Sequence, residues 1–371
     1  MNITLIGPSY PWRGGIAHHT SLLAHHLRKS HNVEIVTFSR QYPSLLFPGR
    51  SQYEAGERGP APPALQWIDS LNPLNWVTVG LRLRKKSPDL IIFAYALPFF
   101  GPCYGTIAAV ARWRRTTRSV FLCHNVVPHE ARFGDRMFTR FAFAFADGFV
   151  VQSETVRNDL LQFRPGAKYT VAPHPLYEMF GEPIDKEEAR RALSISSKRV
   201  ILFFGYVREY KGLMVLLRAM ASLEDVMLLV VGEFYDEEMK YRRLIDNLQI
   251  GDRVRITNEY VPNDLLPRYF SAADAVVLPY LSATQSGIVQ IAYNFGKPVI
   301  ASRIGGLAEV VVDEETGFLV APNDPDALAG AIKRFYSGEC EPSFVKNISI
   351  VRQQYSWTRM VQAIGDLARD I

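Results

Sequence analysis

The sequence predicts an α/β protein made of two doubly wound parallel-sheet domains. Its 371 residues exceed the usual size of one domain, about 150 residues. Short apolar runs alternate along the chain with segments of helical periodicity, which is typical of βαβ units. This alternation stops once, near residues 172–185, and then restarts. We therefore expect two facing domains with a ligand cleft between them.

Each half of the chain contributes its own set of expected strands. In the first half they cover residues 3–6, 33–37, 90–93, 120–123 and 148–151, with helices over 17–29 and 133–146. In the second half the strands cover residues 200–204, 227–231, 253–256, 275–278 and 299–301. Residues 42–63 are rich in proline and predict a long loop. The expected domains are 1–174 and 175–354, followed by a helix over 355–371.

The net charge of +5 hides a difference between the halves. Residues 1–180 carry 20 basic and 11 acidic side chains, whereas residues 181–371 carry 22 and 26. The basic first half predicts an anionic partner, such as lipid phosphate, nucleic acid or a charged small molecule. No nucleic-acid reader motif accompanies the charge, so nucleic acid is not expected. Two basic clusters suit an anionic membrane or are solvated helix ends: the first is Arg82, Arg84, Lys85 and Lys86, and the second, around Trp113, is Arg112, Arg114, Arg115 and Arg118.

Cysteine use and hydropathy predict a cytoplasmic protein, with peripheral contact at the inner face of the membrane as a further expectation. The three cysteines have no metal-ligand spacing and are odd in number. The amino terminus lacks the features of a signal peptide. Residues 90–111 have no charge and match the length of a membrane span. Because Pro98, Gly101, Pro102 and Gly105 interrupt them, we expect a buried strand, a loop and a helix there.

Four loops, each between an expected strand and an expected helix, carry residues suited to binding an anion. Gly14 and Gly15 allow close backbone approach before a helix, or they form an ordinary turn. Arg208 and Lys211 suit a diphosphate, because arginine offers a planar fork and lysine a mobile charge; the alternative is two solvated cations. Ser286 starts another helix, whose following amides, those of Gly287 and Ile288, face an anion or are simply capped. The fourth loop contains Gly305, Gly306 and Glu309; the glutamate reaches a donor or caps the helix.

Histidines occur only in the first half. His124 follows an expected strand and faces the expected cleft, or it is a core residue. His18, His19, His25 and His26 recur at spacings of seven rather than four residues, so we expect a solvated or acceptor-facing helix and not a metal site. His129 and Glu130 are further candidates for acceptor contact.

Together these motifs resemble glycosyltransferase family 4, a retaining family with the GT-B fold. The strongest match runs from Gly296-Lys297-Pro298 through Gly305-Gly306 and Glu309 to residues 316–320. Further matches are Gly14-Gly15, Cys123-His124-Asn125, residues 147–154 and the Arg208 to Gly212 loop. The resemblance implies that the first domain binds the acceptor, that the second binds a nucleotide-sugar donor, and that the helix over 355–371 packs back on the first domain.

The resemblance also implies roles for individual residues. His124, Arg208 and Lys211 would be catalytic, and the acceptor would meet His18, His129 and Glu130. No metal and no cofactor is implied, and no DxD pair that would hold a metal is evident. The donor would meet Gly14, Gly15, Tyr260, Gln285, Ser286, Gly287, Ile288 and Glu309.

The chain departs from the family pattern at two positions. Ala283 and Ile291 stand where the family has two glutamates that contact the sugar and the ribose. Three functions therefore stay open: a retaining, hexose-transferring enzyme of surface polysaccharide or glycolipid biosynthesis; a catalytically silent module that binds glycan or a partner enzyme; and another GT-B enzyme, such as a nucleotide-sugar epimerase. Gln285 and Gln290 could replace part of the lost hydrogen bonding.

The division of charge leads to a test. Reversing basic charges within residues 82–118 is expected to weaken acceptor or membrane binding, because this cluster would meet the anionic partner. Donor binding, measured by thermal shift, is expected to stay intact. Equal loss of both would contradict the division of roles between the halves.

Overall fold

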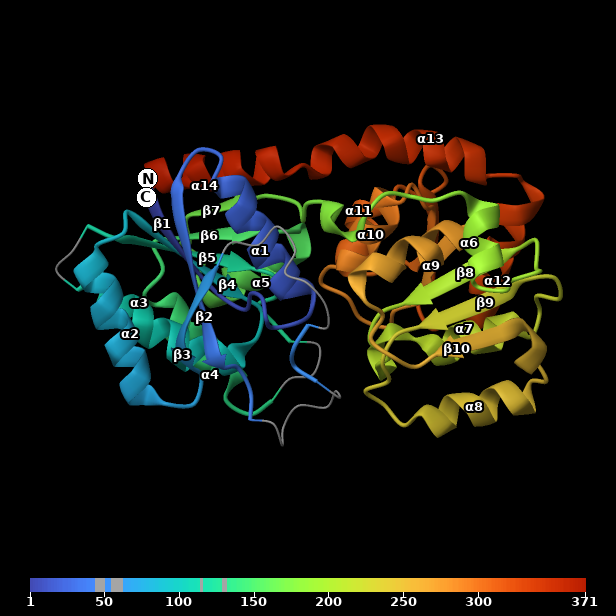
Figure 1. Ribbon diagram of the computed structural model, residues 1–371, viewed down its shortest axis with the longest axis horizontal. Helices are drawn as coiled ribbons and strands as arrows, with labels where there is room; N and C mark the ends of the chain where they lie inside the picture. Colours follow the sequence, from blue (N-terminus) through green and yellow to red (C-terminus); the bar gives the residue numbers. More distant parts are fainter. Residues whose placement is uncertain (44–50, 55–62, 114–115, 129–131) are drawn as a thin grey trace. The chain divides into compact units, whose positions relative to one another are not determined.

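The computed structural model describes residues 1–43, 51–54, 63–113, 116–128 and 132–371. The chain divides into two compact units, each with its own parallel sheet (Figure 1). Unit 1 comprises residues 1–175 and 356–371, and unit 2 comprises residues 176–355. The prediction of two doubly wound α/β domains is confirmed.

Unit 1 contains a seven-stranded parallel sheet in the order β3-β2-β1-β4-β5-β6-β7. All six residues of β4 are buried, as expected for a central strand covered on both faces. Its strands are β1 (Asn2–Ile6), β2 (Asn32–Arg40), β3 (Ala64–Asp69), β4 (Leu90–Tyr95), β5 (Arg118–Cys123), β6 (Gly148–Val151) and β7 (Tyr169–Val171). Its helices are α1 (Gly15–Leu27), α2 (Pro73–Lys86), α3 (Gly101–Arg112), α4 (Asp135–Phe143), α5 (Glu154–Phe163) and α14 (Trp357–Asp370), with a 3₁₀ turn at Pro98–Phe100.

The uncharged segment 90–111 forms strand β4, the 3₁₀ turn and helix α3, as predicted. Its glycines allow α3 to pack closely on α4. A Cβ atom on Gly101 would lie 2.4 Å from the carbonyl oxygen of Phe138, and one on Gly105 would lie 2.7 Å from the ring of Phe141. Within the described ranges, no helix is both long enough and apolar enough to cross a bilayer.

Unit 2 contains a six-stranded parallel sheet in the order β10-β9-β8-β11-β12-β13. Its strands are β8 (Val200–Phe204), β9 (Met227–Val231), β10 (Val254–Thr257), β11 (Ala275–Leu278), β12 (Val299–Ser302) and β13 (Gly317–Val320). Its helices are α6 (Lys186–Ala192), α7 (Leu213–Met220), α8 (Glu238–Asn247), α9 (Leu266–Ala272), α10 (Gly287–Asn294), α11 (Gly305–Val310), α12 (Pro325–Ser337) and α13 (Glu341–Val351). Five 3₁₀ turns cover Glu178–Phe180, Glu209–Lys211, Gly251–Arg253, Asn263–Leu265 and Arg352–Tyr355.

The proline-rich region 42–63 lies partly outside the described residues, namely at 44–50 and 55–62. The described residues 51–54 pack against the turn that follows β1. The amide of Arg13 donates to the Gln52 carbonyl oxygen, and the ring of Tyr53 lies 4.9 Å from that of Trp12. This part of the region therefore contributes to the surroundings of Gly14 and Gly15.

Gly317 in β13 provides a test of how closely the second sheet is packed. A Cβ atom there would lie 1.8 Å from the carbonyl oxygen of Val299. We expect Gly317→Ala to lower the free energy of unfolding by about 2 kcal/mol or more, since backbone must move to make room. Gly330→Ala in α12, where a Cβ meets nothing within 4 Å, should stabilise the protein by up to about 1 kcal/mol. Equal urea unfolding midpoints for the two variants would contradict this.

Candidate active site

Loops that follow the strands of unit 2 meet backbone against backbone at the carboxyl edge of the sheet. Gly232 follows β9 and Gly205 follows β8; a Cβ atom on Gly232 would lie 2.2 Å from the Gly205 carbonyl oxygen. Gly212 has φ near 70°, and a Cβ atom there would lie 1.9 Å from the Pro279 carbonyl oxygen. Only glycine meets both requirements at Gly212. These contacts bring the predicted Arg208 to Gly212 loop against the end of β11.

Lys211 is held inside this edge. Its side chain is buried, and a Cβ atom on Gly205 would lie 2.9 Å from its Nζ atom. The Nζ atom also lies 5.5 Å from the ring centre of Tyr280. Among the described residues no carboxylate forms a salt bridge with Lys211. The guanidinium carbon of Arg208 lies 4.9 Å from the ring centre of Tyr235. Each of the two cations therefore makes a cation–π contact with a tyrosine ring.

Burial sets the charge state of Lys211. Desolvation lowers the pKa of its ammonium group, the nearby cation of Arg208 lowers it further, and Tyr210 opposes this shift. Burying a charged ammonium group without a negative partner is unfavourable in free energy. An anionic ligand at this position would therefore both bind to Lys211 and stabilise its charged form.

The start of α10 is capped by a side chain. The amide of Ile288 donates to Ser286 Oγ at 3.3 Å, which confirms the cap alternative for Ser286. A phosphate here would have to share or replace this bond. Gly287 lies against Tyr177: a Cβ atom on the glycine would be 3.0 Å from the tyrosine ring. Gln285 is half-buried in the loop just before the helix.

The other predicted donor residues occupy the same edge of the sheet. Tyr260 is half-buried three residues after β10, and Glu309 is exposed as the fifth residue of α11. Helix α11 has Ile304 as its N-cap, and this apolar residue makes no side-chain cap bond. Ala283 and Ile291 are both buried and apolar, and thus provide no hydrogen bond from their side chains.

One residue at this edge was missed by sequence reasoning. Glu233 is only 3% exposed and directly follows Gly232 at the end of β9. Its backbone carbonyl oxygen accepts a bond from the Val207 amide, which ties the β9 loop to the β8 loop. The sequence does contain a signal for Glu233, because an acidic residue follows a glycine immediately after the apolar run 227–231.

In unit 1, His124 belongs to a group of buried histidines at the end of β5. The ring of His19 lies 4.6 Å from that of His124 and 4.8 Å from that of His174. Trp357, the first residue of α14, covers His19 at 5.0 Å. Gln152 Nε2 lies 2.9 Å from His19 Nε2, a geometry in which the amide donates to a neutral imidazole.

The histidine group is neutral because it is buried. Desolvation and the neighbouring His174 lower the pKa of His124 to about 3, although a hydrogen bond to Gln152 opposes the shift. Desolvation likewise lowers the pKa of His174 to about 4, against the opposing effect of its backbone hydrogen bonds, and that of His19 well below its ordinary value. His124 is therefore able to donate or accept a hydrogen bond but carries no charge near pH 7.

The other predicted residues of unit 1 lie around the start of α1. Gly14 is its N-cap with φ near 111°, and Gly15 is its first residue. His18 Nε2 lies 3.0 Å from a carboxylate oxygen of Glu54. The expectation of a solvated or acceptor-facing row is wrong for His19, because apolar and histidine rings enclose it. His129 and Glu130 lie outside the described residues.

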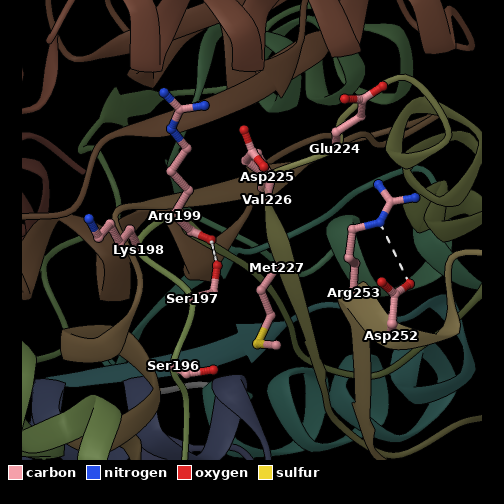
Figure 2. A pocket seen from close by; sticks show the side chains of 10 residues that line it. All are labelled: Ser196, Ser197, Lys198, Arg199, Glu224, Asp225, Val226, Met227, Asp252 and Arg253. Carbon is pink, nitrogen blue, oxygen red and sulfur yellow. Dashed lines mark hydrogen bonds and ion pairs between the residues drawn. The ribbon is translucent and has the colours of Figure 1, made fainter.

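A hollow of about 510 Å³ lies at the opposite edge of the unit 2 sheet, before β8, β9 and β10 begin (Figure 2). Both signs of charge line it, including Lys198, Glu224 and Asp225. Its Arg253 is held by the carbonyl oxygen of Met220 at 3.1 Å. None of the predicted donor residues lines this hollow. In the described residues no group of three or more His, Cys, Asp or Glu side chains is arranged to hold a metal ion.

The two parallel sheets and the cationic glycine loops define a protein of the GT-B glycosyltransferase class. Residues 13–176 match the model of the family described as Glycosyltransferase Family 4, and residues 198–338 match that of Glycosyl transferases group 1. Together these matches span most of the chain. The chain belongs to glycosyltransferase family 4.

Curated relatives share part of this sequence. The D-inositol 3-phosphate glycosyltransferase of Corynebacterium diphtheriae is 33% identical over 204 residues, which are 51% of this chain and 48% of that protein. A second such enzyme, from Catenulispora acidiphila, is 30% identical over 239 residues, or 60% and 56% of the two chains. The matches thus span about half the length of these relatives.

Solved structures share the fold along the whole chain. Sucrose-phosphate synthase from Thermosynechococcus elongatus has a TM-score of 0.77 at 23% identity and covers 100% of this chain and 98% of its own. Anabaena HepE in complex with UDP-glucose has a TM-score of 0.78 at 18% identity, with 100% of both chains covered. At these identities the likeness shows the fold.

The buried histidines predict acid sensitivity. Because the pKa values of His124 and His174 lie at about 3 and about 4 in the folded state, the unfolded chain, with histidine pKa values near 6.5, binds more protons in between. The free energy of unfolding should therefore fall as pH drops below about 6.5, by up to about 1.4 kcal/mol per pH unit for each histidine. Urea unfolding between pH 7.5 and 5 measures this.

A pair of variants isolates the effect. His174→Gln removes one of the buried titrating groups and should give a shallower dependence of unfolding free energy on pH. His25→Gln alters an exposed histidine of α1, which is only a minor cause of the lowered pKa of His26 after burial and Lys29, so it should change the slope much less than His174→Gln does. The same slope in His174→Gln as in the wild type would contradict the role of burial.

Proposed function

We propose that this chain is a retaining glycosyltransferase that moves a hexose from a nucleotide-diphosphate sugar to a glycan or lipid-linked acceptor. The observation that carries this proposal is the buried Lys211, placed beside Gly205 without a salt bridge to any described carboxylate. A diphosphate provides the negative charge that this site lacks. Family membership supports the proposal, as does the UDP-glucose complex of HepE, which has the same fold.

The proposed mechanism assigns the leaving diphosphate to Arg208 and Lys211. Negative charge grows on the diphosphate as its bond to the sugar breaks, so cations held in advance favour the transition state over the ground state. A phosphate oxygen then takes the proton of the acceptor hydroxyl, and the acceptor oxygen bonds to the sugar on the face that the diphosphate leaves. That order retains the anomeric configuration.

The remaining predicted residues bind rather than transfer charge. His124, neutral in its buried group, contacts the sugar through a hydrogen bond. Gln285, Ser286 and the amide of Gly287 meet the diphosphate at the start of α10, while Tyr260 and Glu309 complete the donor site. In the first unit Gly14 and Gly15 allow close approach of the donor, and His18 contacts the acceptor.

We further propose a cytoplasmic place of action in surface polysaccharide or glycolipid biosynthesis. The basic composition of residues 1–180, with 20 basic and 11 acidic side chains, supports an anionic glycan or a phosphate-linked lipid as acceptor. It also supports peripheral contact with an anionic membrane at its inner face.

A catalytically silent module is the second candidate, and one observation favours it. Ala283 and Ile291, 8% and 5% exposed, are apolar where the family has glutamates. Such a module would bind glycan or a partner enzyme without transferring sugar. Sugar transfer by the purified wild type that is lost in Lys211→Ala would exclude it.

Donor binding provides the direct test. Nucleotide sugars that bind the folded state raise its stability, by about 2.7 kcal/mol at a concentration of 100 Kd. Thermal unfolding is measured with a panel that includes UDP-glucose, and at least one member should raise the midpoint. Lys211→Ala should lose most of this rise, because it removes a charge-assisted contact.

Lys198→Ala serves as the matched control. Lys198 lies beside the hollow at the opposite edge of the same sheet, so its loss should leave the donor-induced rise unchanged. The proposal is wrong if no nucleotide sugar raises the midpoint, or if Lys211→Ala responds to the donor as the wild type does.

A further inference from the structure

Helix α4 carries an apolar stripe on its solvent side. Phe133 lies in the turn just before the N-cap of the helix, Gly134, and Met137 and Phe141, four residues apart, share one face of the helix. Their exposed fractions are 106%, 63% and 41%. The inner side of the same helix is different: Thr139, Ala142 and Phe143 are buried in unit 1. Phe133 and Met137 are thus large apolar groups that the fold leaves exposed, whereas the ring of Phe141 also lies against Gly105 of α3.

A row of arginines runs beside the stripe. Arg132, Arg136 and Arg140 precede the three apolar residues by one position each, and all are exposed. None forms a salt bridge with a carboxylate of the described residues. Helix α4 contains a single acidic residue, Asp135, whose carboxylate accepts a bond from the Arg132 amide at 2.7 Å. The outer side of α4 thus combines exposed apolar groups with uncompensated positive charge.

The same combination continues on α2. Leu74 and Leu81 are 79% and 50% exposed, and the helix ends with Arg82, Arg84, Lys85 and Lys86. Helix α3 joins the two, because Gly80 of α2 packs against Val110, and Gly105 of α3 packs against Phe141. These helices form one layer beside the sheet of unit 1 (Figure 1). Together α2, α3 and α4 contain seven basic residues and one acidic residue.

Part of the basic cluster expected from the sequence is occupied elsewhere. Arg112 forms a salt bridge with Asp147 and donates to the Phe145 carbonyl oxygen, while Arg118 donates to the carbonyl oxygen of Ala368. Arg114 and Arg115 lie outside the described residues. Lys86 of α2 also forms a salt bridge, with Glu34. Among the described residues, the charge of this layer that has no salt bridge therefore comes from Arg82, Arg84 and Lys85 of α2 and from the arginines of α4, which were not part of the expected cluster.

We infer that the outer sides of α2 and α4 form a docking surface for an anionic lipid bilayer. The apolar stripe enters the interfacial region, and the arginines beside it pair with lipid phosphates. A bilayer matches both features at once, whereas exposed apolar groups of this size are costly in water. The inference deepens the proposed peripheral contact and rests on it: it names the residues and adds apolar insertion to charge attraction.

Vesicle sedimentation tests the surface without any donor or acceptor. The full chain is mixed with phosphatidylcholine vesicles that contain or lack phosphatidylglycerol, at low and high salt. The wild type should bind only the anionic vesicles at low salt and should keep part of this binding at high salt. Arg132→Gln with Arg140→Gln should lower the partition coefficient at low salt about tenfold or more. Phe133→Ser with Met137→Ser should lower it about tenfold at either salt concentration.

Matched controls separate insertion from general loss of apolar surface. Met239 and Ile350 are 50% and 61% exposed in unit 2, and Met239→Ser with Ile350→Ser should bind vesicles as the wild type does. The thermal shift with the donor panel, unchanged in all these variants, shows that they are folded. It also keeps the result separate from the proposed transfer activity, which is tested by the responses of the wild type and of Lys211→Ala to the donor panel.

Two results would overturn the inference. One is an absence of wild-type binding to anionic vesicles at low salt. The other is equal binding by the wild type and by Phe133→Ser with Met137→Ser. Sedimentation velocity without vesicles tests whether a second copy of the chain occupies the surface instead. A concentration-dependent dimer that Phe133→Ser with Met137→Ser abolishes would assign the surface to that second copy.

Discussion

Backbone contacts at Gly205, Gly212 and Gly232 hold together the loops at the carboxyl edge of the second sheet. A Cβ atom on Gly212 or Gly232 would overlap a backbone carbonyl oxygen, of Pro279 or Gly205 respectively, so neither contact can form with a larger residue unless the backbone moves. Lys211 occupies the space that remains beside Gly205. The cation is therefore positioned by the fold before any ligand arrives, which is the condition for electrostatic stabilisation of a leaving group.

The first unit has uncharged histidines, rather than a cation, at the end of its strand β5. It buries His19, His124 and His174 against one another and under Trp357. Uncharged imidazoles pack as aromatic rings and still offer polar atoms, so they provide hydrogen bonding within an apolar setting. Charge in this unit is instead carried outside, on helices α2 and α4. Lys211 of the second unit is thus buried at a strand end, whereas the cations of α2 and α4 in the first unit are mostly exposed.

Much of the fold followed from the sequence, because buried parallel strands are continuous apolar runs. Strands β3, β7 and β13 were missed. All three lie at sheet edges, and most residues of β3 and β7 are exposed or half-buried. The loop with Arg208 and Lys211 was found because charge follows directly on a strand and precedes a helix. The histidine group was not found: His19, Gln152, His174 and Trp357 are far apart in the sequence, and only the folded chain brings them together.

The position of α14 has a consequence for biosynthesis. Residues 356–371 belong to unit 1 but follow the whole of unit 2 in the chain. On the ribosome, residues 1–175 emerge first and must wait for the synthesis of 180 intervening residues, 176–355, before Trp357 covers His19. Unit 2 has no such delay, because its residues are contiguous. The domain that starts first is therefore completed last, and its open histidine core is the part of the nascent chain that a chaperone would meet.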